Sequence, residues 1–172
     1  MTAPGNLEIE RKFLVRLTGD PTAMPEARTL ELLQLYLIDD GSGSRRIRRT
    51  DEGDDVRFHL AAKREISPGV REELEREIEV GEWSDLRRSA DPERRPITKT
   101  RHVVPAHGRV WEIDVFGGAL AGLVLAEIEF ATAADLELEV EPPACLEIDA
   151  DVTDDRRYGN AGLARLDAPP VR

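Results

Sequence analysis

The stretch Leu7-Glu8-Ile9-Glu10-Arg11-Lys12-Phe13-Leu14-Val15 alternates charged and apolar residues near the start of the chain. In a β-strand, a spacing of two puts Glu8, Glu10 and Lys12 on one face and leaves the apolar side chains mostly on the other. A short solvated helix is the alternative, because Glu8 and Lys12 also stand four residues apart. The same alternation recurs along the chain, and this recurrence favours the strand.

Strand-like alternation is found in the segments 44–50, 56–63, 70–80, 97–104, 110–116 and 123–130. The leucine-rich segment 30–38 fits a helix or a strand, and the hairpin turn that we expect at 39–43 favours the strand. Further turns are expected at 51–55 and 105–109. We predict short helices at 82–90 and 158–166 and leave 132–148 unassigned. About eight strands in sequence predict a mostly β (α+β) fold, an eight-stranded antiparallel closed barrel with a few peripheral helices.

The composition fits one globular domain spanning residues 1–172, since 40% of the residues are hydrophobic and no segment repeats. The net charge of −11 argues against binding to nucleic acid or to an anionic membrane. Cys145 is the only cysteine, so an intrachain disulfide is excluded and a reducing cytoplasm is the expected location. Neither a signal peptide nor a membrane-spanning apolar run is visible.

The polar faces of the expected strands carry an unusual density of charge. The basic set is Lys12, Arg46, Arg48, Lys63, Arg71, Lys99 and Arg101. The acidic set is Glu8, Glu10, Glu73, Glu75, Glu77, Glu112, Asp114, Glu127 and Glu129. A sandwich with a charged solvent face is the alternative, but such a face would normally mix in Ser, Thr and Gln. A charged interior would bind a polyanion through its Arg and Lys side chains and a hard divalent cation through clustered Glu side chains.

The ordered motifs of the chain resemble the CYTH superfamily, the triphosphate tunnel metalloenzymes. The match begins with the signature Glu8-x-Glu10-x-Lys12 and covers nearly the whole chain. It continues through Gln34-Leu35-Tyr36-Leu37, Arg46-Ile47-Arg48, Lys63, Arg71-x-Glu73-x-Glu75, Lys99-Thr100-Arg101, 111–116, Gly122-Leu123, 126–129, Asp151-Val152-Thr153 and 158–163. Asp151 replaces the family's usual Glu, and the aromatic residue often found shortly before it is absent. Both departures fall in the C-terminal cover of the tunnel.

The resemblance implies metal-dependent hydrolysis of a triphosphate inside a charged tunnel. It implies catalytic roles for Glu8, Glu10, Lys12 and Glu129. The implied phosphate ligands are Lys12, Arg46, Arg48, Lys63, Arg71, Lys99 and Arg101. The implied ligands of Mg²⁺ or Mn²⁺ are Glu8, Glu10, Glu73, Glu75, Glu127, Glu129 and Asp114.

Compact bacterial members that resemble this chain are mostly inorganic triphosphatases, so the expected reaction converts tripolyphosphate to pyrophosphate and phosphate. A class IV adenylate cyclase, a thiamine or nucleoside triphosphatase, and a non-catalytic polyphosphate- or nucleotide-binding module stay open as alternatives. The shortage of aromatic residues, 5% of the chain, argues against a purine pocket. The expected partner is a small-molecule triphosphate, with neither nucleic acid nor membrane involved, and a homodimer stays open.

Overall fold

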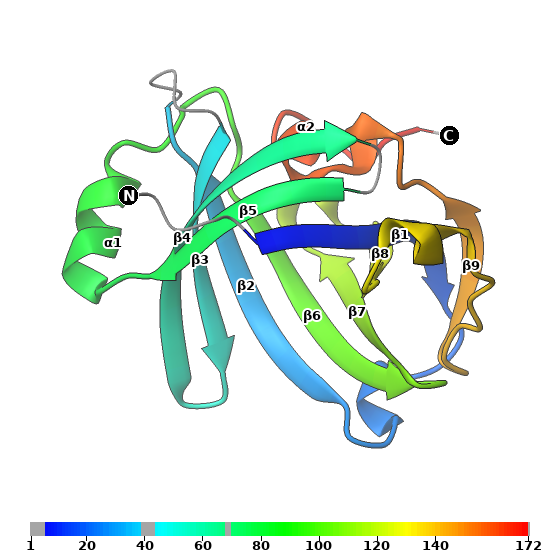
Figure 1. Cartoon of the computed structure of the whole chain (residues 1–172). Coiled ribbons are helices and arrows are strands. Elements are labelled where there is room, and N and C mark those ends of the chain that lie inside the picture. The colour runs from blue at the N-terminus through cyan, green and yellow to red at the C-terminus, as the bar shows by residue number, and fades with distance from the viewer. Residues whose placement is uncertain (1–5, 39–43, 68–69, 172) are drawn as a thin grey trace.

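The computed structural model describes residues 6–38, 44–67 and 70–171, and within them nine β-strands and two α-helices (Figure 1). The side chains of residues 6, 63–65, 67, 71 and 73 lie outside this description. The strands are β1 (Asn6–Leu17), β2 (Arg28–Tyr36), β3 (Ser44–Glu52), β4 (Asp55–Ser67), β5 (Val70–Glu77), β6 (Ile97–Ala106), β7 (Arg109–Phe116), β8 (Val124–Glu129) and β9 (Leu146–Asp151). The helices are α1 (Val80–Arg87) and α2 (Asn160–Leu163), with 3-10 turns η1 (Pro21–Ala23), η2 (Gly118–Leu120), η3 (Ala133–Glu137) and η4 (Arg156–Tyr158).

All nine strands form one antiparallel sheet in the order β5-β4-β3-β2-β6-β7-β8-β1-β9. Strand β1 has twelve residues, and it pairs with three partners along its length. Its start pairs with β5, with Glu8 opposite Arg71, its middle pairs with β8, and its end pairs with β9. The predicted strand at 7–15 is therefore confirmed, and its first residues make an additional pairing with β5, at one end of the strand order.

The ninth strand corrects the predicted number of eight. Strand β9 overlaps the end of the segment 132–148, which the sequence pattern leaves unassigned because prolines and acidic residues interrupt it. It pairs with β1 across a register shift between Leu14 and Val15. It covers the end of β1, and its alternation of Leu146, Ile148 and Ala150 with acidic residues is a signal that the sequence prediction missed.

Several predicted boundaries differ from the structure, most clearly those of the segments 70–80 and 105–109. The segment 70–80 was predicted as one strand, but β5 ends at Glu77 and α1 begins at Val80. The buried side chain of Ile78 packs with Trp83 of α1, which turns the chain out of the sheet. The turn predicted at 105–109 is shorter, because β6 runs through Ala106 and the turn is confined to residues 107–108, both with positive φ. The turn predicted at 39–43 lies outside the described residues.

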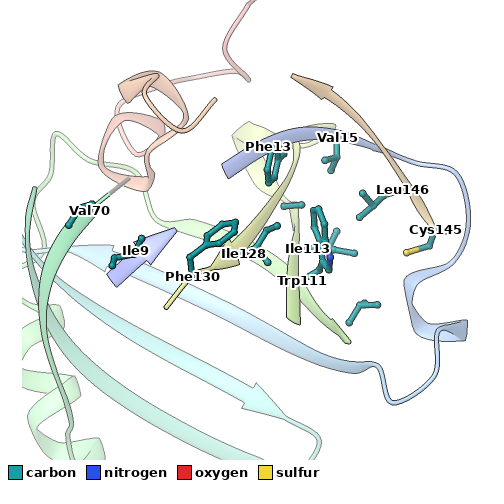
Figure 2. Packing of buried hydrophobic residues seen from close by; sticks show 12 residues of the cluster. Ile9, Phe13, Val15, Val70, Trp111, Ile113, Ile128, Phe130, Cys145 and Leu146 are labelled. Carbon is teal, nitrogen blue, oxygen red and sulfur yellow. The ribbon is translucent and has the colours of Figure 1, made fainter. Parts of the chain in front are cut away.

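Apolar side chains pack on the outer side of the sheet. The largest cluster unites Phe13 and Val15 of β1 with Trp111 of β7 and Leu146 of β9, as Figure 2 shows. The rings of Phe13 and Trp111 lie 5.8 Å apart. Since this face of β1 is apolar and covered, the alternation of the strand turns Glu10 and Lys12 to the opposite face.

One further cluster covers another part of the outer side, and a third fills one end of the inner side, where its Tyr36 lines the cavity. Helix α1 packs Trp83 against Phe58 of β4, with ring centroids 5.1 Å apart. Near the C-terminal end, Tyr158 and Leu163 pack with Ile97 and Phe116 at the ends of β6 and β7. Helix α1 thus covers part of the outside of the sheet, whereas the C-terminal segment packs on the inner face beside the charged side chains. Neither helix in the described chain is long and apolar enough to cross a membrane.

Candidate active site

The charged faces of the strands enclose a cavity of about 880 Å³. Of the described residues that line it, ten are Arg or Lys and nine are Asp or Glu. The lining of β1 comes from Glu8, Glu10 and Lys12, and the lining of β3 includes Arg46 and Arg48. These positions are two apart, as the alternation of a strand requires. The cavity is therefore balanced in charge inside a chain of net charge −11.

The cavity brings together most of the predicted site residues. Those that line it are Glu8, Glu10, Lys12, Arg46, Arg48, Glu75, Lys99, Arg101, Glu127 and Glu129. Asp114 lies behind the lining and is 1% exposed. The side chains of Lys63, Arg71 and Glu73 lie outside the described part of the chain, although backbone pairing places Lys63 opposite Glu73.

Strands β6 and β7 hold a buried ion-pair network. Arg101 donates two hydrogen bonds of 2.7 Å to the two carboxylate oxygens of Asp114. Lys99 also contacts Asp114, and Arg101 contacts Glu112. A buried charge is tolerated in a protein when it is paired and hydrogen-bonded in this way. Asp114 therefore fixes the two cations at the cavity wall.

Burial and neighbouring charges shift the acidities in this network. Burial lowers the pKa of Lys99 to about 8, and the positive charge of Arg101 acts in the same direction, whereas Asp114 opposes the shift. Burial also acts to lower the pKa of Arg101, but Asp114 outweighs it and holds this pKa above its ordinary value. Burial raises the pKa of Glu112. Lys99 is thus the cation of this wall that can lose its proton in the mildly alkaline range.

Strands β1 and β8 form a different wall. Lys12 Nζ lies 2.7 Å from Glu127 Oε1, and Arg101 Nη2 lies 3.2 Å from the other oxygen of the same carboxylate. Burial acts to raise the pKa of Glu127, but Lys12 and Arg101 lower it well below its ordinary value. Two positions further along the β1–β8 ladder, Glu10 stands directly opposite Glu129. Two like charges opposite each other destabilise a sheet unless a cation lies close to them.

Carboxylates of this wall fit a divalent cation that also takes oxygens from a substrate. The described residues contain no group of three or more His, Cys, Asp or Glu side chains arranged to hold a metal ion. Mg²⁺ commonly binds through one or two carboxylates together with water and substrate phosphates, and it does not need a cage made of protein alone. The juxtaposed Glu10 and Glu129, with Glu8 two residues along β1, meet that requirement.

Strand β3 supplies two guanidinium groups from the opposite side. Arg46 and Arg48 stand opposite Tyr36 and Gln34 of β2, respectively. Arg48 Nη2 lies 2.8 Å from Glu75 Oε1, in a pair whose side chains are 23% and 29% exposed. Burial raises the pKa of Tyr36, so its hydroxyl stays protonated beside Arg46. Both arginines offer planar donors to an anion in the cavity.

The C-terminal segment is hydrogen-bonded to the backbone of β1 at Lys12. The backbone N–H of Lys12 donates to Thr153 Oγ1 at 3.0 Å, and the N–H of Val152 donates to the Lys12 carbonyl at 2.8 Å. Asp151 accepts from the Thr153 N–H and pairs with Arg11 on the outer side, at 2.7 Å. The departure from Glu to Asp at this position therefore falls outside the cavity lining, in a clamp on the backbone of Lys12.

The cavity also contains residues that the sequence did not predict as part of the site. Gln34 and Tyr36 line it from β2, and Arg94 reaches it from the connection between α1 and β6. The Arg94 guanidinium lies 4.9 Å from the centre of the Tyr36 ring. The spacing of Gln34 and Tyr36 signalled an inward face of β2. Arg94 lies outside any alternating segment, and only the fold brings it to the site.

Similar proteins share one activity in their names. The chain is 32% identical to an inorganic triphosphatase of Nitrosomonas europaea over 157 residues, which cover 91% of this chain and 96% of that protein. It is 34% identical to an inorganic triphosphatase of Acetivibrio thermocellus over 159 residues, 92% of this chain and 93% of that protein. The crystal structure of the inorganic triphosphatase NE1496 matches with a TM-score of 0.60 and 30% identity over 99% of each chain.

No protein-family model matches the chain. The relatives nevertheless agree with the ordered motifs and with a charged cavity built from alternating strands. The chain belongs to the family of the inorganic triphosphatases, within the CYTH superfamily that its motifs resemble.

Proposed function

We propose that this protein hydrolyses inorganic triphosphate to pyrophosphate and phosphate inside its charged cavity. The observation that carries the proposal is the set of five basic side chains that converge on one cavity from the three strands β1, β3 and β6: Lys12, Arg46, Arg48, Lys99 and Arg101. A linear triphosphate is a small, highly charged anion whose oxygens need many donors. The two relatives named inorganic triphosphatase support the same substrate.

In this proposal, strands β1 to β8 close into a barrel whose interior is the substrate tunnel. The pairing of β1 with β5 supports closure, because it links the two ends of the eight-strand order. A closed barrel excludes bulk water from its interior, and electrostatic interactions with the substrate become stronger in such a site. The C-terminal residues Thr153 and Arg156, which line the cavity, would cover the substrate from one side.

We assign the carboxylates to two groups. Glu8, Glu10 and Glu129 would hold one or two Mg²⁺ or Mn²⁺ ions, and triphosphatases of this family generally depend on a divalent metal. Bound there, such an ion would neutralise charge on phosphate oxygens and lower the pKa of a water molecule. Glu75, Glu112, Asp114 and Glu127 each contact an Arg or Lys side chain and would orient that basic side chain toward the substrate. The proposed metal ligands are therefore Glu8, Glu10 and Glu129, a smaller set than the one that the sequence analysis predicted.

The protein's own groups then position the reaction. Lys12, Lys99 and the arginines hold the phosphates in line, so that a water oxygen attacks the terminal phosphorus and the bond to the bridging oxygen breaks. The pyrophosphate that leaves carries the electron pair of that bond, and its new charge lies among the same cations. Catalysis of phosphoryl transfer consists mostly of such positioning and charge stabilisation.

The lining favours inorganic triphosphate over a nucleotide. Among the described residues of the cavity wall, Tyr36 is the only Phe, Tyr or Trp, and Arg94 lies over its ring. A cyclase must also bind adenine and ribose so that the 3′-hydroxyl attacks the α-phosphorus in line. The wall offers charged groups for phosphate and few surfaces on which a purine could stack.

A single domain over residues 1–172 and a cytoplasmic location complete the proposal. The single cysteine, Cys145, is a buried thiol, 3% exposed, and burial raises its pKa. A thiol of this kind suits a reducing compartment and plays no part in the proposed reaction.

The test is a phosphate-release panel over tripolyphosphate, ATP, thiamine triphosphate and pyrophosphate, each with Mg²⁺ or Mn²⁺. We expect tripolyphosphate to be cleaved far faster than ATP, and pyrophosphate to inhibit or to be inert. Formation of cAMP and pyrophosphate from ATP with Mn²⁺, at a rate that matches tripolyphosphate cleavage, would transfer the assignment to a cyclase. Binding of tripolyphosphate without turnover would leave only a binding module.

A further inference from the structure

Gln34 is a neutral polar residue at the centre of the charged cavity. It is the only glutamine in the chain, and it lies on β2 between β3 and β6. Its side chain is nearly fully buried, with 2% of the residue exposed, yet it lines the cavity. The proposed function assigns it no role, although its position is surrounded by the cations that would bind phosphate.

The amide nitrogen of Gln34 is a buried donor that lacks an acceptor. Among the described residues, Gln34 Nε2 has no hydrogen-bond partner. In folded proteins the large majority of buried polar groups are hydrogen-bonded, so such an atom calls for a physical explanation. It lies at the cavity wall, where a ligand can reach it.

The strand register explains why the protein supplies no acceptor there. Gln34 stands directly opposite Arg48 of β3. On the other side of β2, Leu32 stands opposite Lys99 of β6, which makes Lys99 a diagonal neighbour of Gln34. Guanidinium and ammonium groups are donors only. An acceptor that enters the cavity would satisfy the additional donor in this row.

We propose that Gln34 is a further substrate-binding residue, whose Nε2–H donates a hydrogen bond to an oxygen of the tripolyphosphate chain between Arg48 and Lys99. The inference rests on the proposed function, because it takes tripolyphosphate as the ligand. A neutral donor adds recognition of an oxygen without adding charge. The Gln34 amide would therefore fix the position of the tripolyphosphate between Arg48 and Lys99 without changing the net charge of the cavity.

A purely structural role for Gln34 makes the opposite prediction about stability. If its amide stabilised the wall of β2, its removal would destabilise the free protein. If the amide forms its hydrogen bond only with a bound ligand, replacing Gln34 by an apolar residue of similar size removes an unsatisfied donor. The ligand-free protein then stays as stable as the wild type or becomes more stable. Thermal stability without ligand therefore separates the two roles.

The experiment compares the wild type with Gln34→Leu and Gln34→Glu, and uses Leu33→Met as the control. Leu33 is the neighbouring residue on β2, and it packs on the outer side with the α1 cluster. Calorimetry gives the Kd of tripolyphosphate without metal, steady-state kinetics give KM and kcat, and a melting curve of the ligand-free protein gives Tm.

For Gln34→Leu we expect Kd and KM to rise about tenfold, the loss of one hydrogen bond to a charged acceptor. Its Tm without ligand should equal or exceed that of the wild type, while the rise of Tm on adding tripolyphosphate becomes smaller. Gln34→Glu should raise Kd further, because it places a negative charge beside the anion. Leu33→Met should leave Kd and KM unchanged.

An unchanged Kd in Gln34→Leu, or a Tm lowered by several degrees in the ligand-free variant, would overturn the inference and leave the proposed function intact. A wild type that binds tripolyphosphate but does not cleave it refutes the proposed function, and the change in Kd still decides the role of Gln34. A wild type that binds no tripolyphosphate refutes both.

Discussion

Two adjacent pairs of strands in the cavity wall use their carboxylates in different ways. Between β6 and β7, Asp114 is 1% exposed and contacts both Lys99 and Arg101. Between β1 and β8, Glu10 faces Glu129, a carboxylate opposite a carboxylate. The first arrangement sets a carboxylate between two basic side chains, whereas the second sets two carboxylates opposite each other.

This difference shows that the role of a carboxylate in a charged cavity depends on its cross-strand partner. Both walls have the same sequence pattern, acidic residues two apart, as in Glu112 and Asp114 or in Glu127 and Glu129. In the first wall the acidic residues orient substrate-binding cations. In the second, Glu127 likewise contacts Lys12, whereas Glu10 and Glu129 stand opposite each other, where one added cation could bind both, and this is the chemical basis of the proposed metal site.

The largest effect is expected from breaking the first wall with Asp114→Asn. The change leaves Lys99 and Arg101 buried with much less negative charge beside them. Losing one partner of a buried ion pair typically costs about 3–5 kcal/mol of unfolding free energy. Urea denaturation measures this loss. The control is Asp85→Asn, which removes an exposed carboxylate from the pair with Arg88 on α1 and should cost little.

Metal titration of the same variant tests whether Asp114 is also a metal ligand, as the sequence analysis predicted. As a counter-ion only, Asp114 should leave the metal concentration for half-maximal activity nearly unchanged. A large increase in that concentration, with stability preserved, would contradict the division between the two walls.

The second prediction breaks the other wall with Glu10→Gln. The amide keeps the size of the side chain but removes the charge that a hard cation needs. We expect metal-dependent turnover to fall by about 100-fold or more, in line with the loss of a metal ligand. The metal-free affinity for tripolyphosphate should persist or increase, since repulsion of the anion falls. Phosphate release and calorimetry measure the two effects.

Glu147→Gln serves as the matched control for Glu10→Gln, because Glu147 lies on β9 and pairs with Arg16 on the exposed outer side. Its activity should equal that of the wild type. Unchanged turnover in Glu10→Gln would exclude Glu10 as a metal ligand and leave the like-charged pair without an explanation.

The sequence predicts which side chains of the two walls face the cavity, but it does not predict which side chains pair across the strands. Alternation places Glu10, Lys12, Lys99 and Arg101 on inward faces, because strand geometry alone decides which side a residue faces. Alternation says nothing about pairing across strands, so it could not separate Asp114 from Glu129. That distinction needs the register of the sheet, which depends on long-range packing.

The missed elements have the same physical origin. Strand β9 is short and follows a proline-rich segment, and it becomes a strand through its pairing with β1 and the burial of Leu146. Arg94 lies between secondary-structure elements, so no period marks it. Local patterns identify residues on regular strands, whereas residues placed by tertiary contacts require the structure.

The third prediction tests, through the pKa of Lys99, whether the basic side chains of the β6–β7 wall face the ligand. Burial lowers this pKa from 10.5 to about 8, so the free protein loses the Lys99 proton as the pH rises through 8. Triphosphate favours the charged ammonium, and binding above pH 8 should therefore take up a proton and weaken by at most tenfold per pH unit. Metal-free calorimetry at pH 9, in two buffers of different ionisation enthalpy, measures the uptake.

Lys99→Arg provides the comparison, because a guanidinium stays charged throughout this range. The variant should take up less proton on binding than the wild type. Between pH 8 and 10.5 the unfolded chain binds more protons at Lys99 than the folded protein does. The unfolding free energy of the wild type should therefore rise with pH across this window relative to Lys99→Arg. Equal proton uptake in both proteins would show that Lys99 does not face the ligand.

The smallest effect is expected at Glu75, which we assign to the carboxylates that orient a basic side chain. It is more exposed than Asp114 or Glu127. Its pair with Arg48 has a length of 2.8 Å and is about a quarter exposed, so water screens it and its contribution to stability is at most about 1 kcal/mol. As a counter-ion it competes with the substrate for Arg48. Glu75→Gln should then lower the KM for tripolyphosphate by no more than about threefold, with kcat and the metal requirement unchanged. As a metal ligand, which the sequence analysis also predicted, it would show the reverse: a higher metal requirement and a lower kcat. Steady-state kinetics at several Mg²⁺ concentrations distinguish the two, and Glu77→Gln, one inward position further along β5, controls for a general change in charge.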